Sequence, residues 1–342
     1  MKIAIILFNL GGPDKLENVK PFLFNLFYDP AILNLPKFLR YPLAKLLSNR
    51  RTPIAKEIYK EMGGSSPILK RTKEQANSLE QSLNSSQNDV VYKSLIVMRC
   101  WHPRASETIQ QLKKFDPDEV ILLPLYPQFS AVTSGSSINE WKNICKDKGF
   151  NVKTSTICCY PTDQNFIDGH IEEIQKKIGV LENLRIIFSA HGLPEKNIKK
   201  GDPYQWQVEQ TVNKIVKKMN IENLDYVLSY QSKVGPLKWI GPSTEDIIIE
   251  TSKNNKDIVL VPIAFVSEHS ETLVELDIEY KKIAKENGCT NYIRVPALGS
   301  NQLFIKGLAQ LIINKEAYKF RNNLFPPKTR CPSNFSKCPC LQ

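Results

Sequence analysis

The sequence predicts an α/β fold with two Rossmann-like domains, each built from a parallel sheet and crossover helices. One observation is that short apolar runs alternate with longer amphipathic stretches. The apolar runs lie near residues 2–8, 90–98, 119–125, 152–158, 184–190, 224–230 and 257–265. A second observation is the length of 342 residues, which exceeds one ordinary core, while the 42% apolar content is enough to fill two. We therefore expect two sheets with a cleft between them.

The first apolar run predicts a buried strand rather than an export signal. It spans residues 2–8 and leads into Gly11-Gly12-Pro13, so its apolar core is too short for a signal peptide and no cleavage-like stretch follows. The glycine pair lacks the spaced third glycine of a dinucleotide loop, which argues against a nucleotide cofactor. No apolar run approaches the roughly 20 residues that a membrane helix needs. We expect a cytoplasmic protein.

The net charge of +11 is unevenly distributed along the chain. Residues 37–60 carry one acidic side chain, Glu57, and are rich in leucine and aromatic residues. Their basic side chains are Lys37, Arg40, Lys45, Arg50, Arg51, Lys56 and Lys60. This pattern does not favour nucleic-acid binding. It fits a pair of core-facing helices with solvated basic faces, and it also fits an amphipathic lip that rests on anionic lipid.

Two apolar runs end in polar motifs that could form one site. Residues 184–190 lead into His191-Gly192-Leu193-Pro194, and residues 257–265 lead into Ser267-Glu268-His269-Ser270-Glu271. Ligands of open α/β sheets bind beyond the carboxyl ends of the strands, which is where both motifs fall. A histidine beside an apolar strand is often a structural residue, but the constrained loop after His191 favours a functional role.

Glutamates recur at steps of three and four residues after the second run, at Glu268, Glu271, Glu275 and Glu279. On a helix they would form one acidic stripe, with His269 inside it. Such a stripe is usually a solvated face, but this one begins directly after a buried strand. Crowded and partly desolvated carboxylates have raised pKa values, which suits them to take up and release protons.

Seven motifs along the chain carry a resemblance to a known enzyme family. They occupy residues 9–13, 63–67, 126–130, 189–194, 201–204, 231–242 and 267–277. In these motifs and in their order, the chain resembles the ferrochelatases, which insert ferrous iron into protoporphyrin IX to form protohaem, the terminal step of haem biosynthesis. The resemblance implies an N-terminal domain over residues 1–128 and a C-terminal domain over 129–325 that carries His191 and Glu271. A tail over 326–342 would return to the first domain.

The resemblance also implies roles for individual residues. His191 and Glu271 would bind Fe(II) and handle protons on one side of the macrocycle. The acidic path would be continued by Glu268 and Glu275. The porphyrin would be bound by Tyr59 and Arg99 on the opposite wall, by Ser66 as a propionate or loop contact, and by the apolar walls of Trp239 and Phe265. Cys100 departs from the family pattern, because relatives often have an aromatic residue there.

The chemistry of metal insertion fits these residues. A metal can enter a porphyrin only after two pyrrole protons leave, and a pocket that bends the ring exposes its nitrogen lone pairs. An imidazole suits proton transfer near neutral pH. Imidazole and carboxylate ligands suit Fe(II), and so few of them would hold it loosely enough to release it. Either His191 or Glu271 could be the first base.

Eight cysteines in a chain without an export signal argue against a disulfide framework. Three of them, Cys331, Cys338 and Cys340, lie close together in a Pro-rich, basic tail, where thiols need a metal or remain oxidisable. The tail resembles that of bacterial ferrochelatases with a 2Fe-2S cluster, and Cys158 is the expected fourth ligand. Its neighbour Cys159 would point to the opposite face if the strand continued. Zinc and unligated thiols are the competing interpretations.

Other functions remain as alternatives. A coproporphyrin ferrochelatase would differ only at the rim of the pocket. A non-catalytic haem or iron carrier would need neither the acidic stripe nor a base. A serine hydrolase using Ser189 and His191 is disfavoured, because Ser189 lacks the flanking glycines of a nucleophile elbow. The animal-type cluster is excluded, since Ala131 stands at its internal ligand position. The sequence leaves the oligomeric state open.

Overall fold

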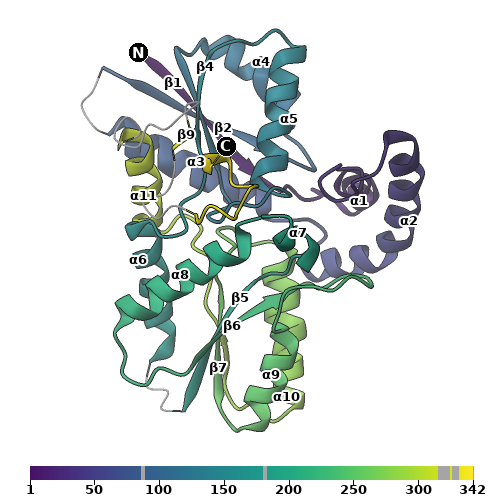
Figure 1. The fold of residues 1–342 in the computed structure, drawn as a ribbon, viewed down its shortest axis with the longest axis vertical. Helices are drawn as coiled ribbons and strands as arrows, with labels where there is room; N and C mark the ends of the chain where they lie inside the picture. Colours follow the sequence, from purple (N-terminus) through teal and green to yellow (C-terminus); the bar gives the residue numbers. More distant parts are fainter. Residues whose placement is uncertain (86–88, 180–182, 315–323, 326–330, 342) are drawn as a thin grey trace.

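The computed structural model describes residues 1–85, 89–179, 183–314, 324–325 and 331–341. It contains two parallel sheets, one above the other along the long axis of the molecule (Figure 1). The N-terminal sheet has the order β2-β1-β3-β4-β9 and the C-terminal sheet the order β6-β5-β7-β8. The predicted fold class is confirmed.

The strands follow the apolar runs of the sequence. Central strands β1 and β3 are buried almost throughout, as expected for parallel strands that helices cover on both faces. The bounds of the N-terminal sheet are β1 Lys2–Asn9, β2 Val91–Met98, β3 Glu119–Pro124, β4 Lys153–Ile157 and β9 Leu324–Phe325. Those of the C-terminal sheet are β5 Leu184–His191, β6 Tyr226–Gln231, β7 Asp257–Pro262 and β8 Tyr292–Arg294. β8 and β9 have three and two residues, too few for a sequence pattern to reveal.

Helices connect the strands as crossovers. Those around the N-terminal sheet are α1 Val19–Phe27, α2 Lys37–Glu61, α3 Ile68–Asn84, α4 Ala105–Phe115 and α5 Ser134–Asp147. Those that follow are α6 Gln164–Ile178, α7 Glu195–Lys199, α8 Tyr204–Met219, α9 Thr244–Lys253, α10 Tyr280–Glu286 and α11 Gln302–Ile313. Short 3₁₀ turns span Leu16–Asn18 and Pro339–Leu341, and a π-helix, η2, spans Glu271–Glu279. Residues 37–61 form one long helix, not a pair, despite Pro42 and Pro53 within it.

The change of sheet does not coincide with the boundary expected at residue 128. β4 pairs with β3, so residues 129–157 belong with the N-terminal sheet. β9 pairs with β4, so the end of the 129–325 segment returns to the first sheet as well. Of the 326–342 tail, residues 331–341 are described, and they pack against Cys158 and Phe129. The chain therefore crosses from one sheet to the other between β4 and β5 and comes back near its C-terminus.

A buried polar network joins the two halves beside the polar motif that follows β7. Gln75 on α3 donates to the carbonyl of Val266 at 2.7 Å and accepts from the Ser267 hydroxyl at 2.7 Å. Asn9, at the end of β1, donates to Thr72 at 3.0 Å. Because these side chains are buried, an unmade bond would carry a desolvation penalty of about 1–3 kcal/mol. The network therefore fixes the loop after β7 against the N-terminal half.

One buried histidine makes stability depend on pH. Both ring nitrogens of His170 on α6 lack a hydrogen-bond partner among the described residues, and its ring packs edge-on against Phe166 at 4.8 Å between centroids. Burial lowers the pKa of His170 to about 3. In the unfolded chain the pKa of histidine is about 6.5, so between these values the unfolded state binds more protons.

We therefore predict that His170 lowers the free energy of unfolding as the pH falls from about 6.5 toward 3, by up to about 1.4 kcal/mol per pH unit. His170→Leu removes this titration and should flatten that part of the stability curve, measured by denaturant unfolding at several pH values. The exposed His102, replaced in the same way, is the control. Equal slopes in wild type and His170→Leu would contradict the assignment.

Candidate active site

His191 lies at the carboxyl end of β5, as the sequence predicted. Its Nε2 atom is 3.6 Å from Oε1 of Glu271, and its Nδ1 atom is 2.7 Å from the carbonyl oxygen of Gly192. Tyr204, at the start of α8, donates its hydroxyl hydrogen to the backbone carbonyl of His191 at 3.0 Å. The side chains of His191 and Glu271 are 37% and 28% exposed. Two groups 80 residues apart in sequence thus meet where solvent and ligand reach them.

A second imidazole contacts the same carboxylate. Nε2 of His269 is 3.3 Å from Oε2 of Glu271, and its Nδ1 is 3.0 Å from the carbonyl oxygen of Ser267. Burial by itself would raise the pKa of Glu271, but His191 and His269 outweigh it and lower that pKa to about 2. Burial by itself would lower the pKa of His269, but the hydrogen bond with Glu271 has a larger effect in the opposite direction. The pKa of His269 is therefore raised. The carboxylate is therefore held ionised between two imidazoles.

Three of the four predicted glutamates lie on the π-helix η2, which begins at Glu271. π-Helical turns are rare and occur frequently at functional sites. Glu275 accepts hydrogen bonds from the backbone N–H and the hydroxyl of Ser232, at 2.9 and 2.5 Å, and from Tyr280 at 2.9 Å. Burial and the neighbouring Glu275 raise the pKa of Glu279. Glu271, Glu275 and Glu279 thus form the acidic stripe.

Glu268 precedes this helix and faces a different partner. Its Oε1 atom is 2.7 Å from Nη1 of Arg294 and accepts from the backbone N–H of Ala297 at 2.9 Å. Arg294 also binds Asp277 through two contacts of 2.7 Å. Burial would raise the pKa of Glu268, but Arg294 outweighs it and lowers that pKa. The expected single stripe through all four glutamates is therefore wrong at Glu268, because its helical spacing assumed a helix that begins only at Glu271.

Three predicted wall residues lie close to the imidazole pair. The Phe265 ring is 4.7 Å from the ring of His269 and 6.4 Å from that of His191, and the Trp239 ring is also 6.4 Å from His191. A Cβ atom on Gly192 would be 3.0 Å from the Trp239 ring, so glycine permits this approach. Tyr59 on α2 interacts with Ser270 and Glu271. Burial, followed by the Glu271 charge, raises the Tyr59 pKa to about 12.

Arg99 and Ser66 are held by protein partners. The Arg99 guanidinium contacts Asp29 at 2.8 Å and Glu140 at 3.2 Å, and it donates to Ser136 at 2.8 Å. Two carboxylates therefore neutralise Arg99, which is 12% exposed. Ser66 packs against Gly12, where a Cβ atom would be 2.4 Å from the serine oxygen. In the structure Ser66 thus makes a contact between two loops.

The predicted cysteine ligands converge from two distant segments. The sulfur atoms of Cys158, Cys338 and Cys340 lie within 4.8 Å of one another, and Cys331 joins them through a thiol–thiol hydrogen bond with Cys338. Hydrogen bonds from Cys158 and Cys338 lower the pKa of Cys340 to about 5. All these thiols are buried. Four buried sulfur donors, of which Cys338 and Cys340 have lowered pKa values because of hydrogen bonds from neighbouring thiols, form a set that can hold iron–sulfur or zinc.

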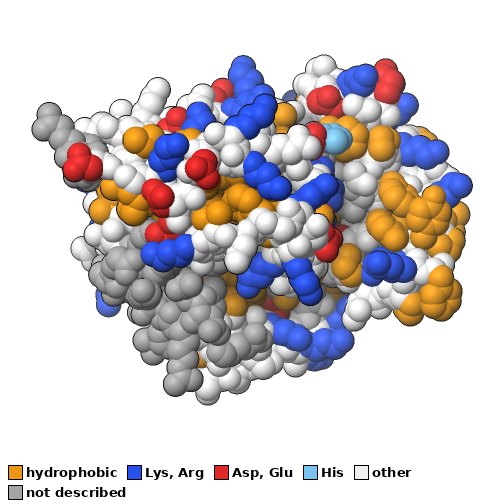
Figure 2. All heavy atoms as spheres, turned by 90° about the horizontal axis from the view of Figure 1, so that it is seen from above, with side chains coloured by type: hydrophobic (Ala, Val, Ile, Leu, Met, Phe, Trp, Pro, Cys, Tyr) orange, Lys and Arg blue, Asp and Glu red, His pale blue; other side chains and the backbone are white. Residues whose placement is uncertain are grey.

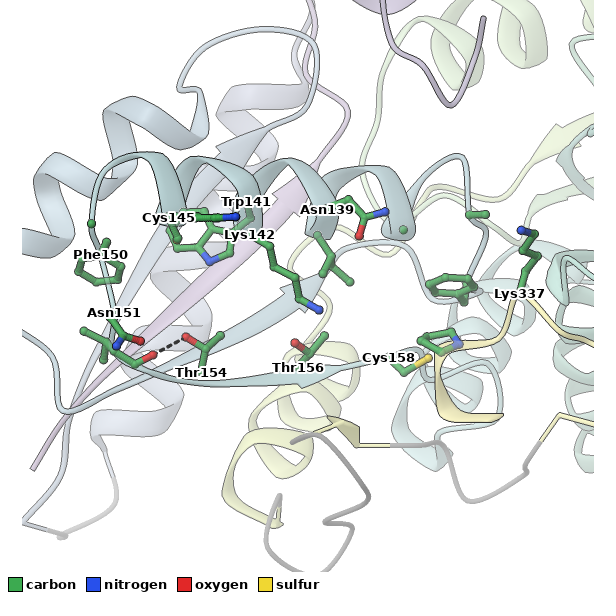
Figure 3. A pocket seen from close by; sticks show the side chains of 18 residues that line it. Asn139, Trp141, Lys142, Cys145, Phe150, Asn151, Thr154, Thr156, Cys158 and Lys337 are labelled. Carbon is green, nitrogen blue, oxygen red and sulfur yellow. Dashed lines mark hydrogen bonds between the residues drawn. The ribbon is translucent and has the colours of Figure 1, made fainter. Parts of the chain in front are cut away.

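Cys159 is close to this group as well. Its sulfur is 3.6 Å from that of Cys158, so the expectation that it points to the opposite face is wrong. That expectation required the strand to continue, but β4 ends at Ile157 and the alternation ends with it. A groove of about 920 Å³ between α5 and β4 ends near Cys158 and Lys337 (Figure 3). Its described lining includes neither His191 nor Glu271.

Sequence reasoning missed two kinds of site residue. His269 was placed in the acidic stripe without a role, although it contacts Glu271 directly. Its adjacency to Glu268 and Glu271 in a motif was the available signal. Gln75 and Tyr204 support the backbone around the two histidines from other elements. No local pattern reveals such support, because it depends on how distant segments meet.

The fold belongs to a known class. SirB from Bacillus subtilis with Fe³⁺ has a TM-score of 0.54 at 13% identity, covering 92% of this chain and 95% of that chain. The sirohydrochlorin chelatase SirB of Bacillus subtilis subspecies spizizenii, in complex with cobalt, has a TM-score of 0.52 at 11% identity, covering 93% and 98%. At such identities the likeness concerns the fold alone. The protein has the two-sheet fold of the chelatases.

The family follows from the sequence comparisons. The ferrochelatase family profile matches residues 2–316. Ferrochelatase from Pelagibacter ubique (strain HTCC1062) is 71% identical over 100% of this chain and 99% of its own length, and that from Rickettsia bellii (strain OSU 85-389) is 51% identical over 99% and 95%. The chain belongs to the ferrochelatase family. It is a porphyrin metal chelatase, a lyase of haem biosynthesis whose substrates are ferrous iron and a porphyrin, and the carrier and hydrolase alternatives are not favoured.

Within the described residues, no helix is both long enough and apolar enough to cross a membrane.

Proposed function

We propose that Fe(II) enters protoporphyrin IX at the pair formed by His191 and Glu271. The observation that carries this proposal is the 3.6 Å separation of His191 Nε2 and Glu271 Oε1, both on side chains that are more than a quarter exposed. One nitrogen and one oxygen ligand would bind the ion weakly enough to pass it on.

The hydrogen bonds of His191 define its part in proton transfer. Its Nδ1 faces the carbonyl oxygen of Gly192, which keeps a hydrogen on that nitrogen. The lone pair of the neutral ring therefore lies on Nε2, which faces Glu271 and the open side of the site. In this arrangement Nε2 accepts a pyrrole proton, and Glu271 stabilises the imidazolium that forms. His269 keeps Glu271 in place from the other side.

Protons would leave along the π-helix. Glu275 follows Glu271 on η2, and Glu279, with its raised pKa, follows Glu275 toward the outside. We assign the acidic path to Glu275 and Glu279. Glu268 has a structural role beside this path, because its ion pair with Arg294 anchors the segment that precedes η2.

The surroundings favour protoporphyrin over coproporphyrin. Trp239, Phe265 and Tyr59 would contact the ring, and they give the site apolar walls. Arg99 is neutralised by Asp29 and Glu140, so it offers no free charge for additional propionates. A substrate with two propionates and otherwise apolar edges suits such walls better than one with four.

We propose that Cys158, Cys331, Cys338 and Cys340 hold a 2Fe-2S cluster. Four buried thiols supply the ligand number that such a cluster needs, and the spacing of the tail resembles that of bacterial ferrochelatases with this cluster. The cysteine centre, meaning these four residues, is then a structural unit that ties the tail to β4.

We propose that the enzyme is cytoplasmic and rests on the inner face of the membrane through α2. The helix exposes Phe38, Leu39, Tyr41, Leu46 and Ile54, which we name the apolar lip. Figure 2 shows apolar side chains gathered at the end of the molecule that holds α1 and α2, with Lys and Arg beside them. Across from α2, the loop after β6 exposes Val234 and Leu237. Such surfaces bind the interface of anionic membranes, where an apolar porphyrin would partition.

His191→Ala should abolish iron insertion while porphyrin binding is largely kept, because the imidazole acts on protons and metal and the walls hold the ring. The measurements are anaerobic loss of porphyrin fluorescence with Fe(II), and porphyrin binding by fluorescence quenching. His102→Ala, on the surface, is the control. Full turnover in His191→Ala would overturn the assignment, and stoichiometric change in the wild type would indicate a carrier.

Cys338→Ser should yield a protein that has lost its visible absorbance and its iron and sulfide, because Cys338 contacts all three other ligands of the centre. Absorption spectra and metal analysis of anaerobically purified protein make the measurement. Cys145→Ser, a thiol outside the centre, is the control. A colourless wild type that contains zinc would contradict the iron–sulfur assignment.

Phe38→Ser combined with Leu39→Ser should reduce binding to vesicles with anionic lipid at least several-fold, because two exposed apolar side chains no longer enter the interface. Co-sedimentation with vesicles of phosphatidylglycerol and phosphatidylcholine measures it. Ile221→Ser is the control, since Ile221 is 45% exposed and lies outside α2. Unchanged vesicle binding of the double variant would contradict the proposal that the apolar lip binds the membrane.

A further inference from the structure

Gln207 on α8 contacts the cysteine centre, and nothing in the catalytic chemistry uses it. Its side chain is fully buried. Nε2 is 3.2 Å from the sulfur of Cys331 and 3.4 Å from that of Cys159. A primary amide has two N–H groups, so one can serve each sulfur.

The orientation of this amide is set by a third contact. Oε1 of Gln207 accepts the backbone N–H of Phe129 at 2.7 Å. A flipped amide would place its NH₂ group against this N–H and its oxygen against two sulfur atoms. In the described orientation the amide oxygen accepts from Phe129 and the amide nitrogen donates to the cysteine sulfur atoms. Both N–H groups therefore face the cysteines.

We propose that Gln207 is a positioning residue of the cysteine centre that donates N–H···S hydrogen bonds and thereby raises the reduction potential of the bound cluster. This inference rests on the proposed 2Fe-2S cluster. One-electron reduction adds negative charge that is shared with the ligand sulfur atoms. A donor to the Cys331 sulfur stabilises that charge, so hydrogen bonds to sulfur raise the potential.

Gln207 also contacts Cys159, the neighbour of Cys158. The sulfur of Cys159 accepts from Gln207 as that of Cys331 does, while Cys158, Cys338 and Cys340 converge on one another. A bond from Gln207 to Cys159 also holds the backbone that places Cys158 next to it. Gln207 thus acts on the centre at two points, one on each of the segments that supply ligands.

Two substitutions test the proposal. Gln207→Met keeps the length of the side chain and removes all its hydrogen bonds, so it tests their loss without an added charge. Gln207→Glu keeps an acceptor for Phe129 but replaces the N–H donors with a carboxylate oxygen that faces the two sulfur atoms, so it adds a negative charge to the loss of the donors. Both should shift the midpoint potential to more negative values, measured by anaerobic titration with dithionite. Both should also lose iron faster to a chelator, and Gln210→Met on the same helix should match the wild type.

The outcomes separate this proposal from the one on which it rests. A wild type without iron and sulfide would overturn the cluster, and this inference with it. A wild type with the cluster, combined with a potential and iron loss in both Gln207 variants that equal those of Gln210→Met, would overturn only the role of Gln207. If one variant fails to fold, as judged by circular dichroism, the other decides.

Discussion

The site depends on one partly buried carboxylate between two imidazoles. Glu271 is ionised because the charge of a protonated His191 and the hydrogen bond with His269 offset the cost of taking its charge out of water. The three side chains come from the end of β5 and from the segment after β7, two adjacent strands. Parallel pairing places both strand ends at one edge of the sheet. The sheet topology therefore brings together groups that are far apart in sequence, and the ion pair holds them there.

The N-terminal half supports this arrangement from outside the C-terminal sheet. Gln75 binds the backbone just before His269, and Tyr59 adjoins the start of the π-helix. A change in how the two halves meet would therefore act on His269 and Glu271 directly. The proposed metal site, although built almost wholly on one sheet, is therefore supported by side chains from the N-terminal half, which also carries the apolar lip.

The apolar runs of the sequence predicted strands β1 to β7, but not the short strands β8 and β9. The apolar runs ending at His191 and near Phe265 marked strand ends, and parallel topology then made their meeting predictable. What could not be predicted came from distant contacts. Glu268 has the sequence spacing of the acidic stripe, yet its side chain pairs with Arg294 on the short strand β8 and is not part of the stripe. The chain changes sheet after β4 and not at residue 128, because β4 pairs with β3 of the first sheet, and no local sequence pattern reveals such pairing.

The first turn of α8 contacts both the His191 site and the cysteine centre. Tyr204 holds the backbone of His191, and Gln207, one helical turn later, holds Cys331 and Cys159. Asp202, just before the helix, accepts hydrogen bonds from Ser130 and from the backbone N–H of Ala131. One short segment is therefore bonded to β5 and to the C-terminal tail. Tyr204 fixes the position of α8 relative to His191, and Gln207 fixes the same helix relative to the cysteine centre.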